Sequence, residues 1–168
     1  MIRRMKTNGG FTMIETLVAV FIFGLALTAT SFIMITNLNT ANSIKNGYIA
    51  SGLAQEGVEI VRNIRDRDWF LDVPPGSNPF GTTIPDGIHR VQWDSTILMA
   101  VGANPPLKLD STNGLYTYST GTDTIFKRSI TITTVVPNVE KRIIVLVEWE
   151  ERGGTKSLSA EEHLFNWR

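Results

Sequence analysis

The chain has 168 residues, with 16 Lys and Arg against 16 Asp and Glu, so its formal net charge is zero. This length suits about one domain of roughly 150 residues, and the balanced charge gives no basic surface of the kind that binds nucleic acid. The absence of cysteine excludes a disulfide framework, a thiolate metal site and a thiol nucleophile.

The first ten residues carry three cations, Arg3, Arg4 and Lys6, and end in two glycines. Glycine lacks a Cβ, so this backbone can lie extended in a protease cleft. Cleavage after Gly10 would remove the three cations and leave 13 basic against 16 acidic side chains, a net charge of −3. We therefore expect residues 1–10 to be a basic leader that is removed.

Residues 11–36 form an apolar run in which Glu15 is the only ionisable side chain, and the next charge is Lys45. A bilayer core of about 30 Å requires roughly 20 such residues in a helix, so this run predicts a transmembrane helix. The basic flank predicts a cytoplasmic amino terminus, with the rest of the chain outside. An ordinary secretory signal has an apolar core of about 7 to 15 residues followed by a small-x-small cleavage site, whereas here the small residues precede the run.

The stretch GGFTMIETLVAVFIFGLAL resembles the prepilin leader and class III signal of type IV pilins and pseudopilins. The resemblance implies that a membrane prepilin peptidase cuts between Gly10 and Phe11 and methylates the new amino terminus at Phe11. It also places Glu15 as the fifth residue of the processed chain and implies that it acts in assembly. The competing interpretation is a plain single-pass anchor whose Glu15 only reaches the membrane interface.

The position of Glu15 has a physical rationale. A carboxylate in hydrocarbon costs several kcal/mol unless it is paired or neutralised. The amine exposed at Phe11 would lie four residues away, about 6 Å along a helix. When similar helices pack side by side, the amine of one subunit can instead meet Glu15 of its neighbour, and a slipped register is then penalised in low dielectric. Small residues further along the run, Ala19, Gly24, Ala26 and Ala29, permit close helix approach.

Residues 37–68 are expected to continue the helix outside the membrane, because no proline occurs between Phe11 and Val73. Apolar residues there recur at the helical period, whereas polar residues occupy the other face. The apolar stripe, which we expect to pack on a sheet, comprises Leu53, Ala54, Gly57, Val58, Ile60, Val61 and Ile64, and the opposite face comprises Gln55, Glu56, Glu59, Arg62 and Asn63.

Residues 69–168 are expected to form a β-rich globular head. A loop rich in proline and glycine comes first, up to Arg90, and short strands are predicted at 88–94, 96–101 and 115–119. The last forty residues predict three antiparallel strands, the final two joined by a turn at Gly153 and Gly154. The expected class is α+β with a type IV pilin fold, in which a long N-terminal helix, transmembrane in its first half, packs on a small antiparallel sheet.

Catalytic chemistry is not predicted. His89 and His163 stand alone, because no carboxylate and serine occur at a spacing from them that would support a catalytic triad. Glu148, Glu150 and Glu151 form an acidic cluster, and alternation along the strand places Glu148 and Glu150 together on the solvated face. The sequence therefore predicts no catalytic residue, no cofactor and no metal site.

Two further groups of residues favour structural roles. Asp66 and Asp68 alternate with Arg65 and Arg67, which favours self-paired surface charges over a metal site. The tryptophans Trp69, Trp93, Trp149 and Trp167 could form an adhesive or sugar-binding patch, but core and helix–sheet packing is favoured for them.

Together these features predict a structural subunit, not an enzyme: a minor pilin-like component of a type IV pilus or related filament. The resemblance implies prepilin peptidase, other pilin or pseudopilin subunits and an inner-membrane assembly platform as partners, together with membrane lipid and without nucleic acid. Lack of a cysteine pair favours a minor pilin or a pseudopilin of a type II secretion or DNA-uptake machine. An alternative function of a different class is a single-pass, membrane-anchored extracellular binding domain that does not assemble into a filament.

Overall fold

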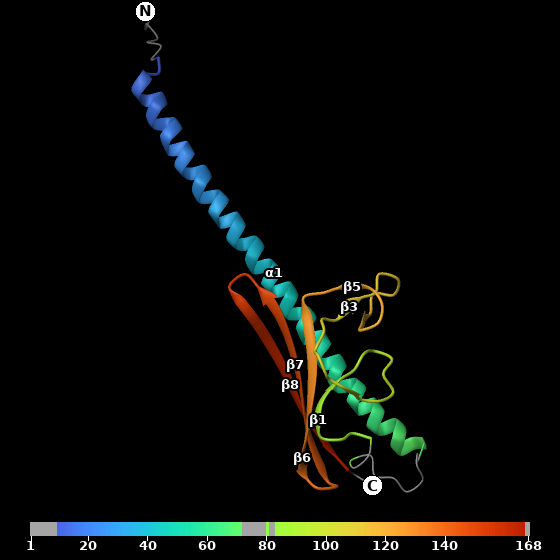
Figure 1. Cartoon of the computed structure of the whole chain (residues 1–168). Coiled ribbons are helices and arrows are strands. Elements are labelled where there is room, and N and C mark those ends of the chain that lie inside the picture. Colours follow the sequence, from blue (N-terminus) through green and yellow to red (C-terminus); the bar gives the residue numbers. More distant parts are fainter. Residues whose placement is uncertain (1–9, 72–79, 81–82, 167–168) are drawn as a thin grey trace, which may run out of the picture. The chain divides into compact units, whose positions relative to one another are not determined.

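The structure is a computed structural model that describes residues 10–71, 80 and 83–166, and within these ranges it contains one helix and eight strands (Figure 1). Helix α1 runs from Met13 to Leu71 without interruption over 59 residues. The chain divides into two compact units, residues 1–44 and 45–168, and the division falls within α1. The strands all belong to the second unit, the head.

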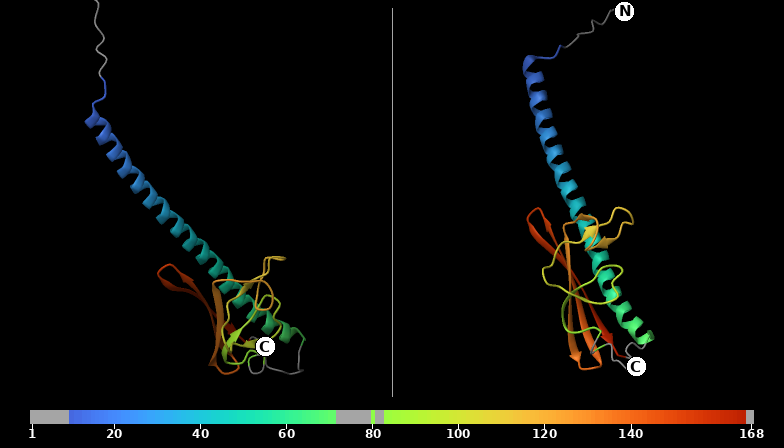
Figure 2. Two further views of the ribbon diagram at one scale, coloured as in Figure 1. Left: turned by 45° about the horizontal axis from the view of Figure 1, so that its top comes forward. Right: turned by 45° about the vertical axis from the view of Figure 1, so that its right-hand side comes forward.

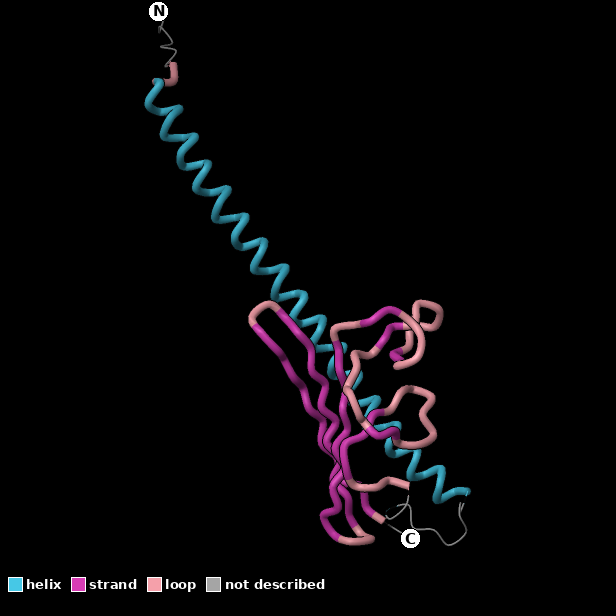
Figure 3. The backbone as a smooth tube through the Cα atoms, viewed as in Figure 1, coloured by secondary structure: helices cyan, strands magenta, loops and turns pink. Residues whose placement is uncertain are grey.

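The strands of the head form two antiparallel sheets, drawn in magenta in Figure 3. The larger sheet has the order β2-β1-β6-β7-β8 and the smaller one the order β4-β3-β5. The larger sheet comprises β1 (Gly87–Arg90), β2 (Met99–Ala100), β6 (Phe126–Val136), β7 (Glu140–Glu151) and β8 (Gly154–Phe165). The smaller comprises β3 (Lys108–Leu109), β4 (Tyr116–Thr117) and β5 (Thr122–Asp123).

Strands β6, β7 and β8 form an antiparallel meander, which confirms the three strands predicted for the end of the chain. Buried side chains alternate with more exposed ones along most of β6 and β7, a pattern that suits a sheet with one buried face. The β7–β8 turn places Gly153 at φ 111° and Gly154 at φ 123°, a region that disfavours side chains with a Cβ. The predicted glycine turn is therefore confirmed.

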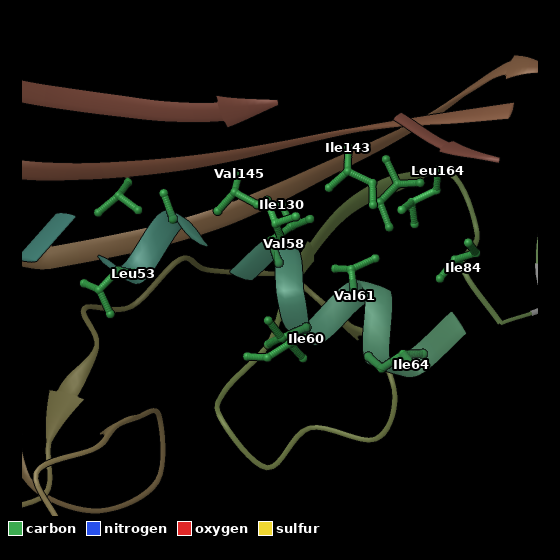
Figure 4. Close-up of a cluster of buried hydrophobic side chains, with 14 of the residues drawn as sticks. Leu53, Val58, Ile60, Val61, Ile64, Ile84, Ile130, Ile143, Val145 and Leu164 are labelled. Atoms are coloured by element: carbon green, nitrogen blue, oxygen red, sulfur yellow. The ribbon is translucent and has the colours of Figure 1, made fainter. Parts of the chain in front are cut away.

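The core of the head lies between the second half of α1 and the larger sheet, which run alongside each other in both views of Figure 2. All seven residues of the predicted apolar stripe are buried. Figure 4 shows Val58 and Val61 of the helix facing Ile130, Ile143 and Val145 of the sheet. Burial of this face accounts for the helix–sheet layer, and the α+β layout expected for the pilin fold is confirmed.

The structure departs from the sequence prediction mainly in its shorter segments. Helix α1 ends at Leu71 instead of about Asp68. The strands predicted at 88–94, 96–101 and 115–119 are cut to between two and four residues, and β3 and β5 were not predicted. Two-residue strands show no periodicity, so the sequence cannot reveal them. Residues 72–79 and 81–82 of the predicted loop lie outside the described residues.

The charged end of α1 pairs as predicted but lies deeper. Arg65 Nε is 2.7 Å from Asp66, and Arg67 Nη2 is 3.0 Å from Asp68. However, Arg65 is only 8% and Asp68 only 7% exposed, so the prediction of surface charges is wrong for these two. The guanidinium of Arg65 lies 4.8 Å from the ring centre of Trp69, because the helix end buries the aromatic ring and its neighbours together.

One cation, Arg128 of β6, is fully buried between α1 and the sheet. Its Nη1 donates to the backbone oxygen of Leu53 at 2.9 Å, and its Nη2 donates to that of Val91 at 2.7 Å. Glu56 Oε1 lies 3.6 Å from Nη1. The sequence prediction that Glu56 faces away from the sheet is therefore wrong, because its carboxylate turns back toward this buried charge.

Candidate processing and assembly site

The described residues before α1 have no helical structure. Gly10, Phe11 and Thr12 precede the helix, which begins at Met13. The Phe11 side chain is 81% exposed, and no atom comes within 4 Å of the position that a Cβ on Gly10 would occupy. The peptide bond between Gly10 and Phe11 thus lies in exposed, non-helical backbone, the form in which a protease can take up a chain.

Thr12 caps the amino terminus of α1. The backbone N–H of Glu15 donates to Thr12 Oγ1 at 3.3 Å and to the Thr12 carbonyl oxygen at 3.1 Å, and the N–H of Thr16 donates to the same carbonyl at 3.2 Å. A threonine with a glutamate three residues later is the capping-box spacing, which satisfies N–H groups that have no partner within the helix. These bonds join Thr12 to Glu15 and Thr16 and involve no residue before Thr12.

Glu15 stands in the first turn of α1, and its side chain is exposed. A carboxylate at this place complements the positive end of the helix dipole. The same carboxylate is also within one turn of the chain end that cleavage at Gly10 would create. The carboxylate can therefore form an ion pair with an amine at that chain end or with the amine of a neighbouring helix.

Sequence reasoning identified Gly10, Phe11 and Glu15 but missed Thr12. The signal was present, because the Thr12-x-x-Glu15 spacing is itself a helix-start pattern. The structure places these four residues within positions 10–15 at one helix start, with Thr12 between the predicted cleavage point and the predicted assembly residue.

The described part of the first unit, residues 10–44, is apolar and exposed. Every residue from Gly10 to Lys45 is exposed, including large side chains such as Phe21 at 66% and Phe32 at 70%. Helix α1 is long and apolar enough to cross a membrane. Uncovered apolar surface of this extent requires lipid or other apolar helices around it.

Hydroxyl groups within this unit are satisfied by the helix itself. Thr28, Thr30, Ser31 and Thr36 each donate to a backbone carbonyl three or four residues earlier, at 2.7–2.9 Å. Such bonds remove the cost of placing a hydroxyl in hydrocarbon. These hydroxyl side chains are therefore compatible with a membrane.

The chain matches the prokaryotic N-terminal methylation motif over residues 5–31, a span that includes Gly10, Phe11 and Glu15. It carries the type IV pilin and pseudopilin signature. The pilin-type motif accounts for the order of features at this end: cations and then glycines in the sequence, exposed non-helical backbone at Gly10 and Phe11, a capped helix start and an apolar helix. No curated protein matches the chain. No solved structure matches it either.

The two histidines lie apart from this pilin-type helix end. His89 is nearly buried and its Nε2 lies 2.9 Å from the carbonyl oxygen of Pro85. His163 is exposed, with Nδ1 2.6 Å from Glu140 and Nε2 3.3 Å from Glu161. The hydrogen bond that His163 donates to Glu140, together with the longer one to Glu161, raises the pKa of His163. Among the described residues no group of three or more His, Asp or Glu is placed to hold a metal ion.

The three glutamates near the β7–β8 turn differ in exposure and in their contacts. Glu150 is exposed as predicted, whereas Glu148 is half-buried. The Glu151 carboxylate accepts hydrogen bonds at 2.9 Å from Asn46 Nδ2 and from Trp149 Nε1. Glu151 therefore links the strand to the helix, a structural role.

The tryptophans divide into two groups. Trp69 is 4% exposed and stacks on Phe80, and Trp149 is 7% exposed and lies 6.0 Å from Phe126, so packing is confirmed for both. Trp93 is 47% exposed, and the prediction of packing is wrong for it. Trp167 lies outside the described residues.

Proposed function

We propose that the chain is a structural, minor pilin-like subunit of a type IV pilus or a related filament. Prepilin peptidase cuts between Gly10 and Phe11 and methylates the Phe11 amine. The processed helix then enters the filament beside other pilin or pseudopilin subunits, with the help of an inner-membrane assembly platform. The methylation motif at residues 5–31 is the observation that carries this proposal.

The helix end supports the proposed processing step. The bond to be cut precedes the capped helix by only two residues, Phe11 and Thr12, so the protease has access to extended backbone without unwinding α1. Removal of the leader leaves the helix and its cap intact. Processing would change the charge of the chain and keep its membrane anchor.

Glu15 is proposed to set the register of each added subunit. Its carboxylate is exposed in the first turn, and residues 13–44 offer apolar surface to neighbouring helices. The Phe11 amine of one subunit would meet Glu15 of the next in a low-dielectric core, where an unpaired charge is costly. A fixed axial offset follows, because other registers would leave both charges without partners.

Localisation follows from the same features. Before assembly the helix would span the cytoplasmic membrane, with the amino terminus in the cytoplasm and the head outside. After extraction the subunit would lie in an extracellular or periplasmic filament. Lipid surrounds the helix in the first state, and neighbouring helices cover the same surface in the second.

Mass spectrometry of the intact protein from its native host tests the proposal. We expect a chain that begins at Phe11 and carries one methyl group on its amine. Recovery of the full chain from Met1, or of a chain cut at another bond, would establish a simple anchor and contradict the proposal. A Gly10→Val variant is the control, because a β-branched residue before the bond obstructs uptake in the cleft, so the leader should be retained.

A pseudopilin of a secretion or DNA-uptake machine is the second candidate, and the same motif supports it. The two differ in where the mature subunit resides. Filaments sheared from intact cells should contain the chain if it is a pilus subunit. If mature, methylated chain is found only in the membrane and periplasm, the pseudopilin assignment replaces the pilus assignment.

A further inference from the structure

Trp93 occupies an unusual place in the head. Its indole is 47% exposed, although Trp69 and Trp149 are nearly buried. It belongs to the loop between β1 and β2, coloured yellow-green in Figure 1. An exposed tryptophan leaves a large apolar face in water, and such residues are the commonest anchors of binding sites.

The loop that carries Trp93 is firmly held. Gln92 N–H donates to Ser95 Oγ at 2.8 Å, and Ser95 N–H donates to the Gln92 carbonyl at 2.9 Å, which closes a tight turn around Trp93. Gln92 Oε1 accepts from the Tyr118 backbone N–H at 2.9 Å. Arg67 Nη2 of α1 donates to the Thr96 carbonyl at 2.7 Å. Because the loop is already ordered, a ligand would not have to pay its ordering entropy.

Trp93 borders a hollow of about 330 Å³ between α1 and this loop. Its walls are Asn63 and Arg67 of the helix and Trp93, Asp94, Ser95 and Thr96 of the loop. A volume at the lower end of the range for ligand sites admits a small ligand or the end of a longer one.

Hydrogen-bonding capacity remains on several of these walls. Asn63, with one acceptor and two donors, has no hydrogen-bond partner among the described residues. Asp94 accepts from Gln92 Nε2 through Oδ1 at 2.7 Å, so its Oδ2 remains available. Ser95 keeps its hydroxyl proton, because its oxygen serves as the acceptor in the turn. Donors and acceptors thus alternate around one aromatic face.

The charged side chains that line the hollow do not favour an anionic ligand. Arg67 already holds Asp68 Oδ1 through Nε at 3.1 Å and Nη2 at 3.0 Å, and Asp94 adds a negative charge on the opposite wall. A cation would find only one unpaired carboxylate oxygen. A neutral ligand with many hydroxyl groups and an apolar C–H face fits best, since it offers both donors and acceptors and can stack on an indole.

We propose that the hollow beside Trp93 is a carbohydrate-binding site, in which the indole stacks on a sugar ring while Asn63, Asp94 and Ser95 hydrogen-bond its hydroxyls. This inference goes beyond the assembly role and does not depend on it. The site would give the head an extracellular ligand of saccharide class.

Saturation-transfer NMR on the full chain in dodecylphosphocholine micelles tests the site, because this detergent contains no sugar. The probes are maltotriose, cellotriose and chitotriose, each at roughly 10 mM, a concentration that detects millimolar binding. We expect transfer to the ring protons of at least one of them. Trp93→Ala should weaken that binding about ten-fold or more, as loss of an aromatic anchor does.

Phe165→Ala is the matched control, because Phe165 is also an aromatic residue of the head, 52% exposed, and does not line the hollow. It should bind as the wild type does. Asn63→Ala should weaken binding without changing the unfolding curve, which separates recognition from folding. Absence of transfer to all three saccharides, or equal transfer to Trp93→Ala, would overturn the proposal. If Trp93→Ala instead only reduces incorporation into filaments, the surface is a contact between subunits and the carbohydrate assignment is wrong.

Discussion

Arg128 links three parts of the head through a single guanidinium. It stands on β6, and its two nitrogens reach the carbonyl of Leu53 on α1 and that of Val91 beyond β1. The Tyr118 hydroxyl donates to the Arg128 backbone oxygen at 3.1 Å. A buried charge is tolerated only with such partners. The cation therefore fixes helix, sheet and loop to one another.

Replacement of Arg128 by alanine should lower the free energy of unfolding of the head by about 2–4 kcal/mol, because it opens a cavity and strips the Val91 carbonyl of its donor. Urea unfolding of the full chain in detergent, followed by near-ultraviolet circular dichroism, measures this. Arg62→Ala is the control, since Arg62 is 38% exposed where it pairs with Glu59 and Glu162. Its loss should cost less than about 1 kcal/mol. If the two variants lose equal amounts of unfolding free energy, the burial of Arg128 does not add to the stability of the head.

His163 should make the head more stable in acid than in base. The Glu140 carboxylate, 2.6 Å away, raises the pKa of His163 above its usual 6.5, although Arg142 is its register partner on β7. A raised pKa in the folded state means that the stabilisation is complete below about pH 6.5 and is lost as the pH rises through the raised value. The melting temperature of wild type should therefore exceed that of His163→Gln at pH 6, and the gap should close at alkaline pH. A gap that does not depend on pH would contradict this assignment.

At the scale of elements, the contact between α1 and β7 depends on a glycine. A Cβ on Gly57 would lie 2.8 Å from Val145 Cγ1 and 3.4 Å from Arg128 Cδ. Val145 is fully buried and β-branched, so it cannot rotate away without strain. Gly57 therefore sets how closely the helix approaches the sheet.

Alanine at Gly57 and alanine at Gly52 should have opposite effects on stability. Both gain about 1 kcal/mol of helix propensity. At Gly57 the gain is outweighed by overpacking that costs about 1–3 kcal/mol, so net destabilisation is expected. At Gly52 no atom lies within 4 Å of the added Cβ, so stabilisation is expected. Urea unfolding of the two variants decides it, and a stabilised Gly57→Ala would show that the helix can move off the sheet at little cost.

Elements whose hydrophobic pattern repeats over many residues could be predicted from the sequence, whereas the two-residue strands could not. The stripe from Leu53 to Ile64 repeats at the helical period over three turns, so its burial was predictable. Alternation of Ile130 and Ile132 likewise revealed β6. Arg128 follows the same alternation, but an arginine on a core face is read as an exposed charge, so its burial was missed. The hollow at Trp93 depends on a loop and a helix that are distant in sequence, and no local pattern encodes it.

At the scale of the whole molecule, the two units have different requirements for their surroundings. The head buries its own core, whereas residues 10–45 are exposed throughout. Several hydroxyls of residues 11–36 are satisfied by the helix itself, and the only charge of this run is Glu15. This part of the helix can therefore pass from lipid to a bundle of similar helices with Glu15 as its one charged group. Its uninterrupted apolar run predicted the helix, but the partners that cover it are not encoded in one chain.

Glu15 and Thr12 allow the register role to be separated from helix capping. Glutamine at position 15 keeps the capping-box spacing and removes the charge, whereas Thr12→Ala removes the capping hydroxyl and keeps the charge. If the charge sets the register, Glu15→Gln should reduce incorporation into sheared filaments as strongly as Glu15→Ala. Thr12→Ala should retain most incorporation, since a lost cap costs only about 1 kcal/mol.

The measurement is the ratio of mature subunit in sheared filaments to mature subunit in membranes, with mass spectrometry confirming that each variant is cut at Gly10. Restricting the ratio to mature chains separates assembly from processing, because a variant that the peptidase rejects contributes to neither fraction. If Glu15→Gln assembles like wild type while Glu15→Ala and Thr12→Ala both fail, the first turn matters for its helical structure. The paired-charge account of filament register would then be wrong.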